Sequence, residues 1–451
     1  MTAKFIVQFT LRLLFFSGLL LGASGAMAEL WDTSDSQLSS VQLHGFSTVG
    51  AAWLNQKNAV LVRDFSSRMG MGHYGNPADA DSRLGLQADW QTTSRLSMTV
   101  QAVAAPRIEQ NANNMIPWAF LKYDFDDNIS VRAGRMGVYC FALSDQRNLG
   151  YVYPWVRPPV EFYAFMPIYS MTGADVSWHH DFSPDRSIEV RTFAARSDSS
   201  YYLPDPVVNT DSFSLNLSPM LGGTVIFNDH NASARLAYMT MKIGSTFPGL
   251  ENILQQANTL GPYYPPLAGL GQNADIMGTS VAFYDASFSY DNGKLLVLSE
   301  MAATAFQSQF KPSMLNGYLT LGWHLTPDLL PFVNYSRVSP LRSTYQVATA
   351  AAPTGTANLP VAVQLKIIGG YYYGQSMASQ FNTRYFNGFQ ENQETFSMGL
   401  RWDFRPRMDL KLQVDKTLII GNGYELWQYP PTTSLDPRGV TGVTLTWDTV
   451  F

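Results

Sequence analysis

The sequence predicts an all-β fold: a transmembrane up-and-down antiparallel β-barrel of about sixteen strands, with short periplasmic turns and long external loops. Three observations lead to it: the composition, an alternation of polar and apolar residues, and a regular change between short and long connections. Charged residues make up 14% of the 451 residues and aromatic residues 13%, whereas soluble proteins carry roughly 25% charged residues. A membrane barrel accounts for this composition because its lipid-facing residues occupy every second position.

The first 28 residues have the pattern of an export signal. Lys4 and Arg12 flank a short apolar stretch, and the segment ends in small residues at Ala26 and Ala28. We expect a signal peptide over 1–28, cut after Ala28, and one barrel domain over 29–451. A membrane-anchor helix is the alternative, but this apolar stretch is short. No later segment approaches 18 uninterrupted apolar residues, so membrane-spanning helices are not expected.

The charge and cysteine content limit the partners and the covalent cross-links. The formal net charge is -5, and it becomes more negative once the two basic residues of the signal are removed. A nucleic-acid partner is therefore disfavoured, because phosphates require a basic surface. Cys140 is the single cysteine, so an intramolecular disulfide is excluded.

The main local signal is an alternation with a period of two. At the C-terminus Val443, Leu445 and Trp447 share one parity, while Thr444 and Thr446 share the other. Such a strand has one apolar face and one polar face. The pattern predicts about sixteen strands, an even number, as expected for an outer-membrane barrel. They cover 41–54, 83–91, 94–105, 116–125, 128–136, 170–182, 186–197, 219–228, 231–243, 277–290, 293–306, 314–324, 328–338, 394–404, 408–417 and 441–451.

The connections between these strands alternate between tight and long. The tight ones are rich in Asp, Asn and Pro, as in Asp229-His230 and Asp291-Asn292. Tight turns at one end and long loops at the other are typical of an up-and-down membrane barrel, and a soluble β-sandwich does not explain them. Aromatic residues expected to form a girdle lie beside the tight turns: Trp90, Phe125, Phe182, Tyr290, Phe404 and Phe451.

Two segments do not fit the sixteen-strand pattern cleanly. The segment 339–393 is long for a loop and contains the apolar run 361–368, so a further hairpin there would make eighteen strands. The strand 293–306 has four apolar residues in a row from Leu295 to Leu298. We expect this strand to face either a neighbouring subunit or an inserted loop.

A barrel of sixteen or eighteen strands leaves an aqueous lumen, and the segment 137–169 is the candidate for narrowing it. It combines prolines and aromatic residues with charges, a stiffness that a mobile surface loop does not need. The stretch 132–135 (Arg-Ala-Gly-Arg), followed by 144–145 (Ser-Asp) and 153–159 (Tyr-Pro-Trp-Val-Arg-Pro-Pro), resembles proteobacterial porins. Together with the export signal, the up-and-down strands and terminal Phe451, it resembles the trimeric Gram-negative porins.

The resemblance implies an outer-membrane homotrimer that contacts lipid and lipopolysaccharide and passes small hydrophilic solutes and ions by passive diffusion. It implies a third loop folded into the barrel, where acidic and basic residues face each other across a constriction and sort solutes by charge. It also implies that Phe451, in the C-terminal strand, is the signal for the barrel-assembly machinery. No cofactor, metal or enzymatic activity is implied.

The residues expected to line the constriction lie on the loop and on the barrel wall. The loop set is mixed in charge, which departs from a simple acidic loop, and the wall set is basic, so we expect a preference for anionic or neutral solutes. The alternative for each arginine is a structural salt bridge in the lumen, which is favoured for Arg95 and Arg401. The candidates are Arg132, Arg135, Asp145, Arg147, Arg157 and Glu161 at the loop, and Arg83, Arg191 and Arg235 on the wall.

Three other functions remain open. A substrate-selective channel for phosphate, sugar or carboxylate would use the loop aromatics (Tyr151, Tyr153, Trp155, Phe162 and Tyr163) as a stacking surface. An outer-membrane hydrolase would need a histidine base, but His44 and His324 show no Ser/His/acid grouping. An adhesin that displays its loops is the third. Cys140 has no basic catalytic partner, and one of the adjacent His179 and His180 would face lipid, which disfavours a metal pair.

Overall fold

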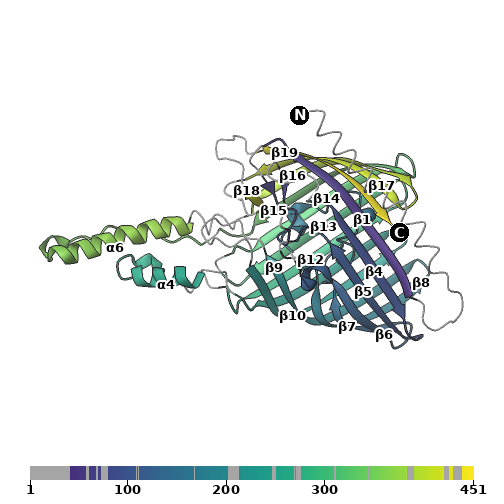
Figure 1. Ribbon diagram of the computed structural model, residues 1–451, viewed down its shortest axis with the longest axis horizontal. Coiled ribbons are helices and arrows are strands. Elements are labelled where there is room, and N and C mark those ends of the chain that lie inside the picture. Colours follow the sequence, from purple (N-terminus) through teal and green to yellow (C-terminus); the bar gives the residue numbers. More distant parts are fainter. Residues whose placement is uncertain are drawn as a thin grey trace.

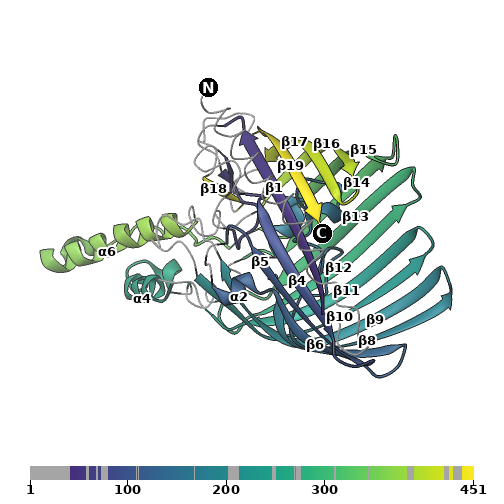
Figure 2. The same ribbon diagram turned by 45° about the vertical axis from the view of Figure 1, so that its right-hand side comes forward.

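The protein is a closed antiparallel β-barrel, as shown by a computed structural model (Figures 1 and 2). The structure describes residues 41–56, 60–67, 70–72, 80–107, 109, 111–166, 168–201, 213–245, 250–268, 270, 276–308, 311–343, 345–382, 391–420, 426–429 and 439–451. The expected signal peptide, residues 1–28, lies outside the described residues. Among these residues no helix is long and apolar enough to cross a membrane.

Sixteen strands form the barrel wall, and each pairs with its neighbours in sequence until the last barrel strand pairs with the first. The sixteen predicted strands are thereby confirmed, with ends that differ by a few residues. They are β1 (Val41–Leu54), β4 (Arg83–Gln91), β5 (Leu96–Ala104), β6 (Trp118–Asp124), β7 (Ile129–Met136), β8 (Met171–Ser183), β9 (Arg186–Tyr201), β10 (Phe213–Asp229), β11 (Ala232–Ile243), β12 (Ser280–Asp291), β13 (Leu295–Phe306), β14 (Met314–Trp323), β15 (Leu329–Pro340), β16 (Gln393–Arg405), β17 (Met408–Ile419) and β19 (Gly439–Val450).

Closure of the barrel removes every free edge of the wall. In the closing pair, Phe46 of β1 lies opposite Val450 of β19, and Leu54 lies opposite Gly442. Beyond the end of β19, Gly45 and Phe451 exchange two backbone hydrogen bonds of 2.7 and 2.9 Å. A membrane-spanning sheet needs this closure because lipid cannot satisfy unpaired N–H and C=O groups.

The alternation in the sequence separates a lipid-facing surface from the lumen. On β11 Leu236 and Tyr238 are exposed on the outside, whereas Ala237 and Met239 are buried inside. Outward apolar residues recur around the barrel, for example Leu86 and Val333. This apolar outer face is what the hydrocarbon of a bilayer requires.

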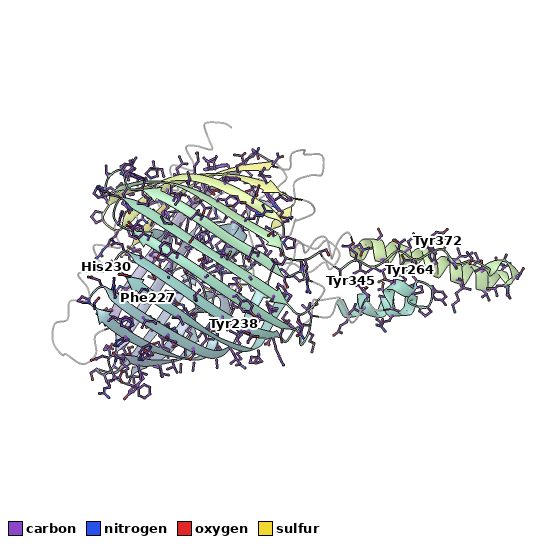
Figure 3. All side chains as sticks on the ribbon, turned by 180° about the vertical axis from the view of Figure 1, so that it is seen from behind. Phe227, His230, Tyr238, Tyr264, Tyr345 and Tyr372 are labelled. Carbon is purple, nitrogen blue, oxygen red and sulfur yellow. The ribbon has the colours of Figure 1, made fainter. Side chains whose placement is uncertain are left out.

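The connections alternate between the two ends of the barrel, as predicted. Short connections follow β4, β6, β8, β10, β12, β14 and β16, and long ones lie at the opposite end. His230 and Arg407 adopt positive φ angles of 52° and 65° within two of the short turns. Figure 3 shows His230 at the end of the barrel away from the helices. We call the two ends the short-turn end and the long-loop end.

Helices project from the long-loop end in place of the extra hairpin that would have made eighteen strands. Residues 361–368 belong to helix α6 (Val361–Gln380), which packs beside α4 (Leu250–Leu260) and η2 (Pro265–Leu267). The eighteen-strand alternative is therefore wrong. The physical reason is that the sixteen-strand wall is already closed. The apolar run 361–368 lies outside this wall, has no free strand edge to pair with, and forms a helix instead.

A few short elements complete the long-loop end. β18 (Trp427–Tyr429) and β3 (Met71–Gly72) pair with β2 (Val60–Leu61) in a small separate sheet. Helix α2 (Ala112–Met115) lies between β5 and β6, and η3 (Thr356–Asn358) precedes α6. Two further elements, η1 (Gly150–Val152) and α3 (Val160–Tyr163), belong to the loop that enters the barrel.

Candidate functional site

The connection from β7 to β8 lies inside the barrel, and we call it the inserted loop (residues 137–166 and 168–170). Its first part is held on the β10–β13 wall: Thr224 Oγ1 donates to the carbonyl of Tyr139 at 2.6 Å, and the Ala142 N–H donates to Glu300 at 2.7 Å. Of the apolar run of β13, Leu298 packs against the cluster that contains Phe141 and Phe162 of the inserted loop.

The tip of the inserted loop reaches the opposite wall. Lys411 Nζ on β17 donates to the carbonyl of Gly150 at 2.6 Å. A Cβ atom at Gly150 would collide with Asp448 and Thr48, so only glycine allows this approach. The loop therefore crosses the lumen from one side to the other.

The returning half of the loop is fixed along β14 to β17. Trp155 Nε1 donates to Thr320 Oγ1 at 2.9 Å. The buried Glu161 carboxylate accepts hydrogen bonds from Ser336, Gln393 and Thr395. Burial raises the pKa of Glu161, and these hydrogen bonds oppose the shift.

The aromatic residues of the loop pack against the wall and do not form an open stacking surface. Tyr153, Trp155, Phe162 and Tyr163 are each 2% exposed or less. The rings of Trp155 and Phe162 make edge-on contacts with Tyr318 at centroid distances of 5.4 and 5.6 Å. Of the five aromatic residues predicted to form a stacking surface for solutes, only Tyr151 keeps part of its surface exposed.

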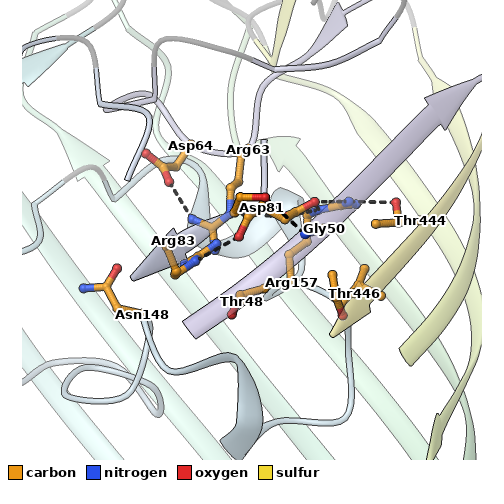
Figure 4. A network of polar contacts seen from close by, with 12 residues as sticks. Thr48, Gly50, Arg63, Asp64, Asp81, Arg83, Asn148, Arg157, Thr444 and Thr446 are labelled. Atoms are coloured by element: carbon orange, nitrogen blue, oxygen red, sulfur yellow. Dashed lines mark hydrogen bonds and ion pairs between the residues drawn. The ribbon is translucent and has the colours of Figure 1, made fainter. Parts of the chain in front are cut away.

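A charge network joins the inserted loop to the first long loop (Figure 4). Arg157 binds Asp81 through two guanidinium nitrogens, Nε at 3.0 Å and Nη2 at 2.7 Å, and also donates to Thr444. Arg63 Nε donates at 3.3 Å to Asp81 Oδ1, which also accepts from Arg157 Nε, and Arg83 Nε donates to the Asp81 carbonyl at 3.2 Å. Asp81 thus connects three arginines from three parts of the chain.

A second carboxylate, Asp64, continues the network toward the long-loop end. It pairs with Arg63 at 3.2 Å and with Arg107 at 3.6 Å. Burial alone would raise the pKa of Asp64, but the positive charges of Arg107, Arg147 and Arg63 overcome it, so this pKa lies below its ordinary value. The pKa of Asp81 is also lowered, because Arg157, Arg63 and Arg83 outweigh the effect of burial.

The predicted arginines fall into two groups by their partners. Arg132 forms a bidentate pair with Asp175, with a shortest distance of 2.6 Å, and Arg191 pairs with Glu189 at 2.9 Å. Arg157 also forms a salt bridge, with Asp81. These three arginines therefore have the structural salt bridges that were the alternative to lining the constriction. The others donate to backbone carbonyls: Arg147 to Met166 and Tyr163, Arg235 to Phe141, Arg135 to Ile116 and Asn113, and Arg83 to Asp81.

Two of the cavities in the lumen have Asn148 in their linings, one on each side of it. The cavity at the long-loop end is lined by Arg107, Arg135, Tyr169 and Asn148. The cavity at the short-turn end has a volume of about 510 Å³, and Asp145 and Asn148 form part of its lining. Burial raises the pKa of Asp145, although Arg132, Arg191 and Arg235 oppose the shift.

The residues that sequence reasoning missed are Arg63, Asp64, Asp81, Arg107 and Asn148. They lie in loops without periodicity, so alternation does not assign them to the lumen. The run 63–64 (Arg-Asp) is visible as a charged pair in an otherwise mixed loop. Its partners Arg107 and Asp81 are distant in sequence, and no local signal identifies them.

Other reactive groups have no catalytic arrangement among the described residues. His44 lies 3.8 Å from Asp89, and His324 lies 3.3 Å from Asp291, both near the short turns. Within the described ranges, no three His, Cys, Asp or Glu side chains are grouped to hold a metal ion. Cys140 is buried, and burial raises the pKa of its thiol, which disfavours the reactive thiolate.

The sixteen-strand barrel with a loop folded across its lumen has the fold of the outer-membrane porins. Its structural neighbours include OmpF of Salmonella typhi in complex with daunomycin, with a TM-score of 0.51, 12% identity, and coverage of 91% of this chain and 97% of that chain. The outer-membrane channel DcaP of Acinetobacter baumannii aligns with a TM-score of 0.50 and 10% identity over 92% of this chain and 99% of that chain. No family model matches the sequence. No curated protein sequence matches it either.

Proposed function

We propose that this protein is an outer-membrane porin, a non-enzymatic channel for passive diffusion of small hydrophilic solutes and ions. The observation that carries the proposal is the inserted loop, which crosses the lumen of a closed sixteen-strand barrel and is fixed to both walls. A wall of sixteen strands is wide enough for an aqueous lumen. A fixed loop inside it restricts passage by size and by charge without any moving part.

The charges around the crossing favour anionic or neutral solutes. Five guanidinium groups gather where the two loops meet, and the three carboxylates of Asp64, Asp81 and Asp415 balance only part of them. Low-dielectric walls strengthen the field of such an excess charge and raise the local concentration of counter-ions. The five are Arg63, Arg83, Arg107, Arg147 and Arg157.

Planar-bilayer recording of the refolded protein tests this proposal. We expect stepwise ion conductance. In a potassium chloride gradient we expect a reversal potential whose sign shows that chloride permeates more readily than potassium. The absence of conductance in correctly refolded protein would reject the porin. A strong preference for potassium would reject the role of the arginines while leaving the channel in place.

Location and assembly belong to the same proposal. We infer export through residues 1–28, insertion in the outer membrane among lipid and lipopolysaccharide, and assembly as a homotrimer. The apolar outer face of the barrel and the terminal Phe451 support the membrane location. Membrane fractionation, N-terminal sequencing of the mature protein and native mass spectrometry in detergent measure these three features separately.

A further inference from the structure

The cavity at the short-turn end has a lining that differs from the charged crossing above it. It lies between the inner faces of β1, β4, β5 and β6 and the loop tip, and its volume of about 510 Å³ is in the range of small-ligand sites. Its lining includes four side-chain amides, Gln87, Gln101, Gln146 and Asn148, and the inward aromatic residues Phe46 and Trp118. The rest of the lining includes Phe451, His44, Asp145 and Arg407.

A chain of hydrogen bonds fixes the orientation of two of these amides. Gln87 Nε2 donates to Asp89 at 2.7 Å, and Gln101 Nε2 donates to Gln87 Oε1 at 2.9 Å. In this chain the Gln87 amide directs its NH₂ group toward the Asp89 carboxylate and its oxygen toward Gln101. Each amide therefore has one N–H committed within the wall, and each NH₂ group has a second N–H to offer. The Gln101 carbonyl oxygen is an additional acceptor.

The aromatic residues sit beside these amides on the same wall. In the β5–β6 pair Trp118 lies directly opposite Gln101, so both side chains face the lumen. The Phe46 ring lies over Gly85, where a Cβ would collide with it. Trp118 is only half-buried, which leaves indole surface free toward the cavity.

The charges near this cavity do not select for an anion. The arginines facing the neighbouring wall are engaged, since Arg132 pairs with Asp175 and Arg235 donates to the Phe141 carbonyl. The cavity lining itself carries one acidic and one basic side chain, Asp145 and Arg407, so it has no one-sided charge. Apart from these and His44, its polar side chains are amides, which both donate and accept hydrogen bonds, and they lie beside aromatic surface.

We propose that this cavity is a binding subsite for neutral polyhydroxylated solutes, namely carbohydrates of the size of a pyranose. Hydroxyl groups both donate and accept hydrogen bonds, so they match the paired donors and acceptors of the amides. The apolar face of a sugar ring matches the free indole surface of Trp118. This inference rests on the proposed function, because the solute must reach the site through the lumen.

The experiment measures single-channel current in planar bilayers while methyl α-glucopyranoside is added on the short-turn side. We expect reversible current reduction that saturates with sugar concentration, whereas inorganic phosphate at matched ionic strength gives no saturating reduction. Gln101→Leu raises the half-blocking sugar concentration about tenfold or more, since a lost hydrogen-bonding group leaves the sugar hydroxyl without its partner. Gln255→Leu, on the exposed face of α4, is the matched control and leaves the block unchanged.

The outcomes separate this inference from the proposed function. No conductance in the unmodified protein overturns the proposed function. Normal conductance without saturating sugar block, or a block that is unchanged in Gln101→Leu, overturns the subsite alone, as does saturating block by phosphate in place of sugar. If Gln101→Leu does not refold, Trp118→Ala provides the same test through loss of the aromatic surface. Both variants experience the same sugar viscosity as the unmodified channel, so a viscosity effect cancels in the comparison.

Discussion

Asn148 is the residue that the two lumen cavities share. Its side chain accepts a hydrogen bond from Arg107 at 3.3 Å, and it lines the cavity on each side of the inserted loop. We therefore expect the size of this uncharged side chain to limit the passage of solutes between the two cavities.

A larger side chain at position 148 reduces ion flow. We expect Asn148→Trp to lower single-channel conductance about twofold or more, because an indole fills space that hydrated ions use. Asn258→Trp, on the exposed surface of helix α4 outside the lumen, introduces the same ring and leaves the conductance unchanged. Equal conductance in the two variants would place the conduction path away from Asn148.

The Asp64 and Asp81 carboxylates give the protein an acid-sensitive contribution to stability. Their pKa values are lower in the folded protein than in the unfolded chain. This contribution is therefore complete above their ordinary pKa of about 4 and is lost as the pH falls below it. Asp145 and Glu161, whose pKa values are raised, take up protons at higher pH and do not produce the loss in this window.

Asp64→Asn tests the acid sensitivity. At neutral pH we expect the variant to lose about 3 kcal/mol of stability, because the buried Arg63 and Arg107 each lose the negative charge of Asp64. As the pH falls from about 4 to about 2, below the ordinary pKa of an aspartate, the unfolding temperature of the variant falls less than that of the unmodified protein. Thermal unfolding in detergent measures both effects. Asp127→Asn, in an exposed short turn, is the control, and an identical pH profile in all three proteins would contradict the assignment.

At the scale of elements, the helical projection of α4 and α6 has its own packing, which is largely separate from the barrel wall. Tyr371 OH donates to the carbonyl of Ala350 at 2.9 Å, and its ring lies 5.6 Å from that of Tyr264. Gly374 lies so close to Tyr264 that a Cβ there would collide with it. Figure 3 shows Tyr264 and Tyr372 on the projection, beyond the end of the strands.

Loss of the Tyr371 ring loosens the projection alone. We expect Tyr371→Ala to cost about 3–5 kcal/mol of local packing energy, as for other buried aromatic residues. Limited proteolysis therefore cuts within residues 345–382 faster than in the unmodified protein, while conductance stays the same. Tyr372→Ala is the matched control, since its side chain is 61% exposed. A fall in conductance with Tyr371→Ala would show that the projection and the lumen are coupled.

At the scale of the whole molecule, the barrel depends on joining its first and last strands. Phe451 contributes two backbone hydrogen bonds to Gly45 and an outward ring that is 41% exposed. The backbone bonds do not depend on the side chain. We therefore expect the Phe451 ring, which lies over Gly45, to act in recognition by the assembly machinery.

Phe451→Ala separates assembly from stability. We expect the amount of folded protein in the outer membrane of cells to fall several-fold, on the order of 1 kcal/mol or more of lost recognition, while refolding in detergent remains normal. Quantitative immunoblotting of unheated outer-membrane fractions measures the first effect. Phe404→Ala, at another aromatic near the short turns, is the control. Equal loss in cells and in detergent would assign Phe451 to stability and not to recognition.

Local patterns in the chain account for most of the fold and little of the candidate site. Alternation at residues such as Leu410 and Leu412, and turns such as Asp229-His230, depend on neighbouring residues, so the strands and their order could be predicted. The run 361–368 misled prediction because short apolar runs fit a strand or a helix equally well. The choice between strand and helix for this run depended on the closure of the sixteen-strand wall, which involves residues far away in the sequence.

The sequence by itself determined the barrel, its sixteen strands and the outward apolar face, because a period of two and turn composition are local properties. Only the tertiary structure decided which charges meet inside. Arg157 pairs with Asp81, which lies 76 positions away in the sequence, and Lys411 donates to the Gly150 carbonyl, which lies 261 positions away. Such pairs form because closure of the wall brings distant loops into one lumen, where buried charges must find partners or remain costly.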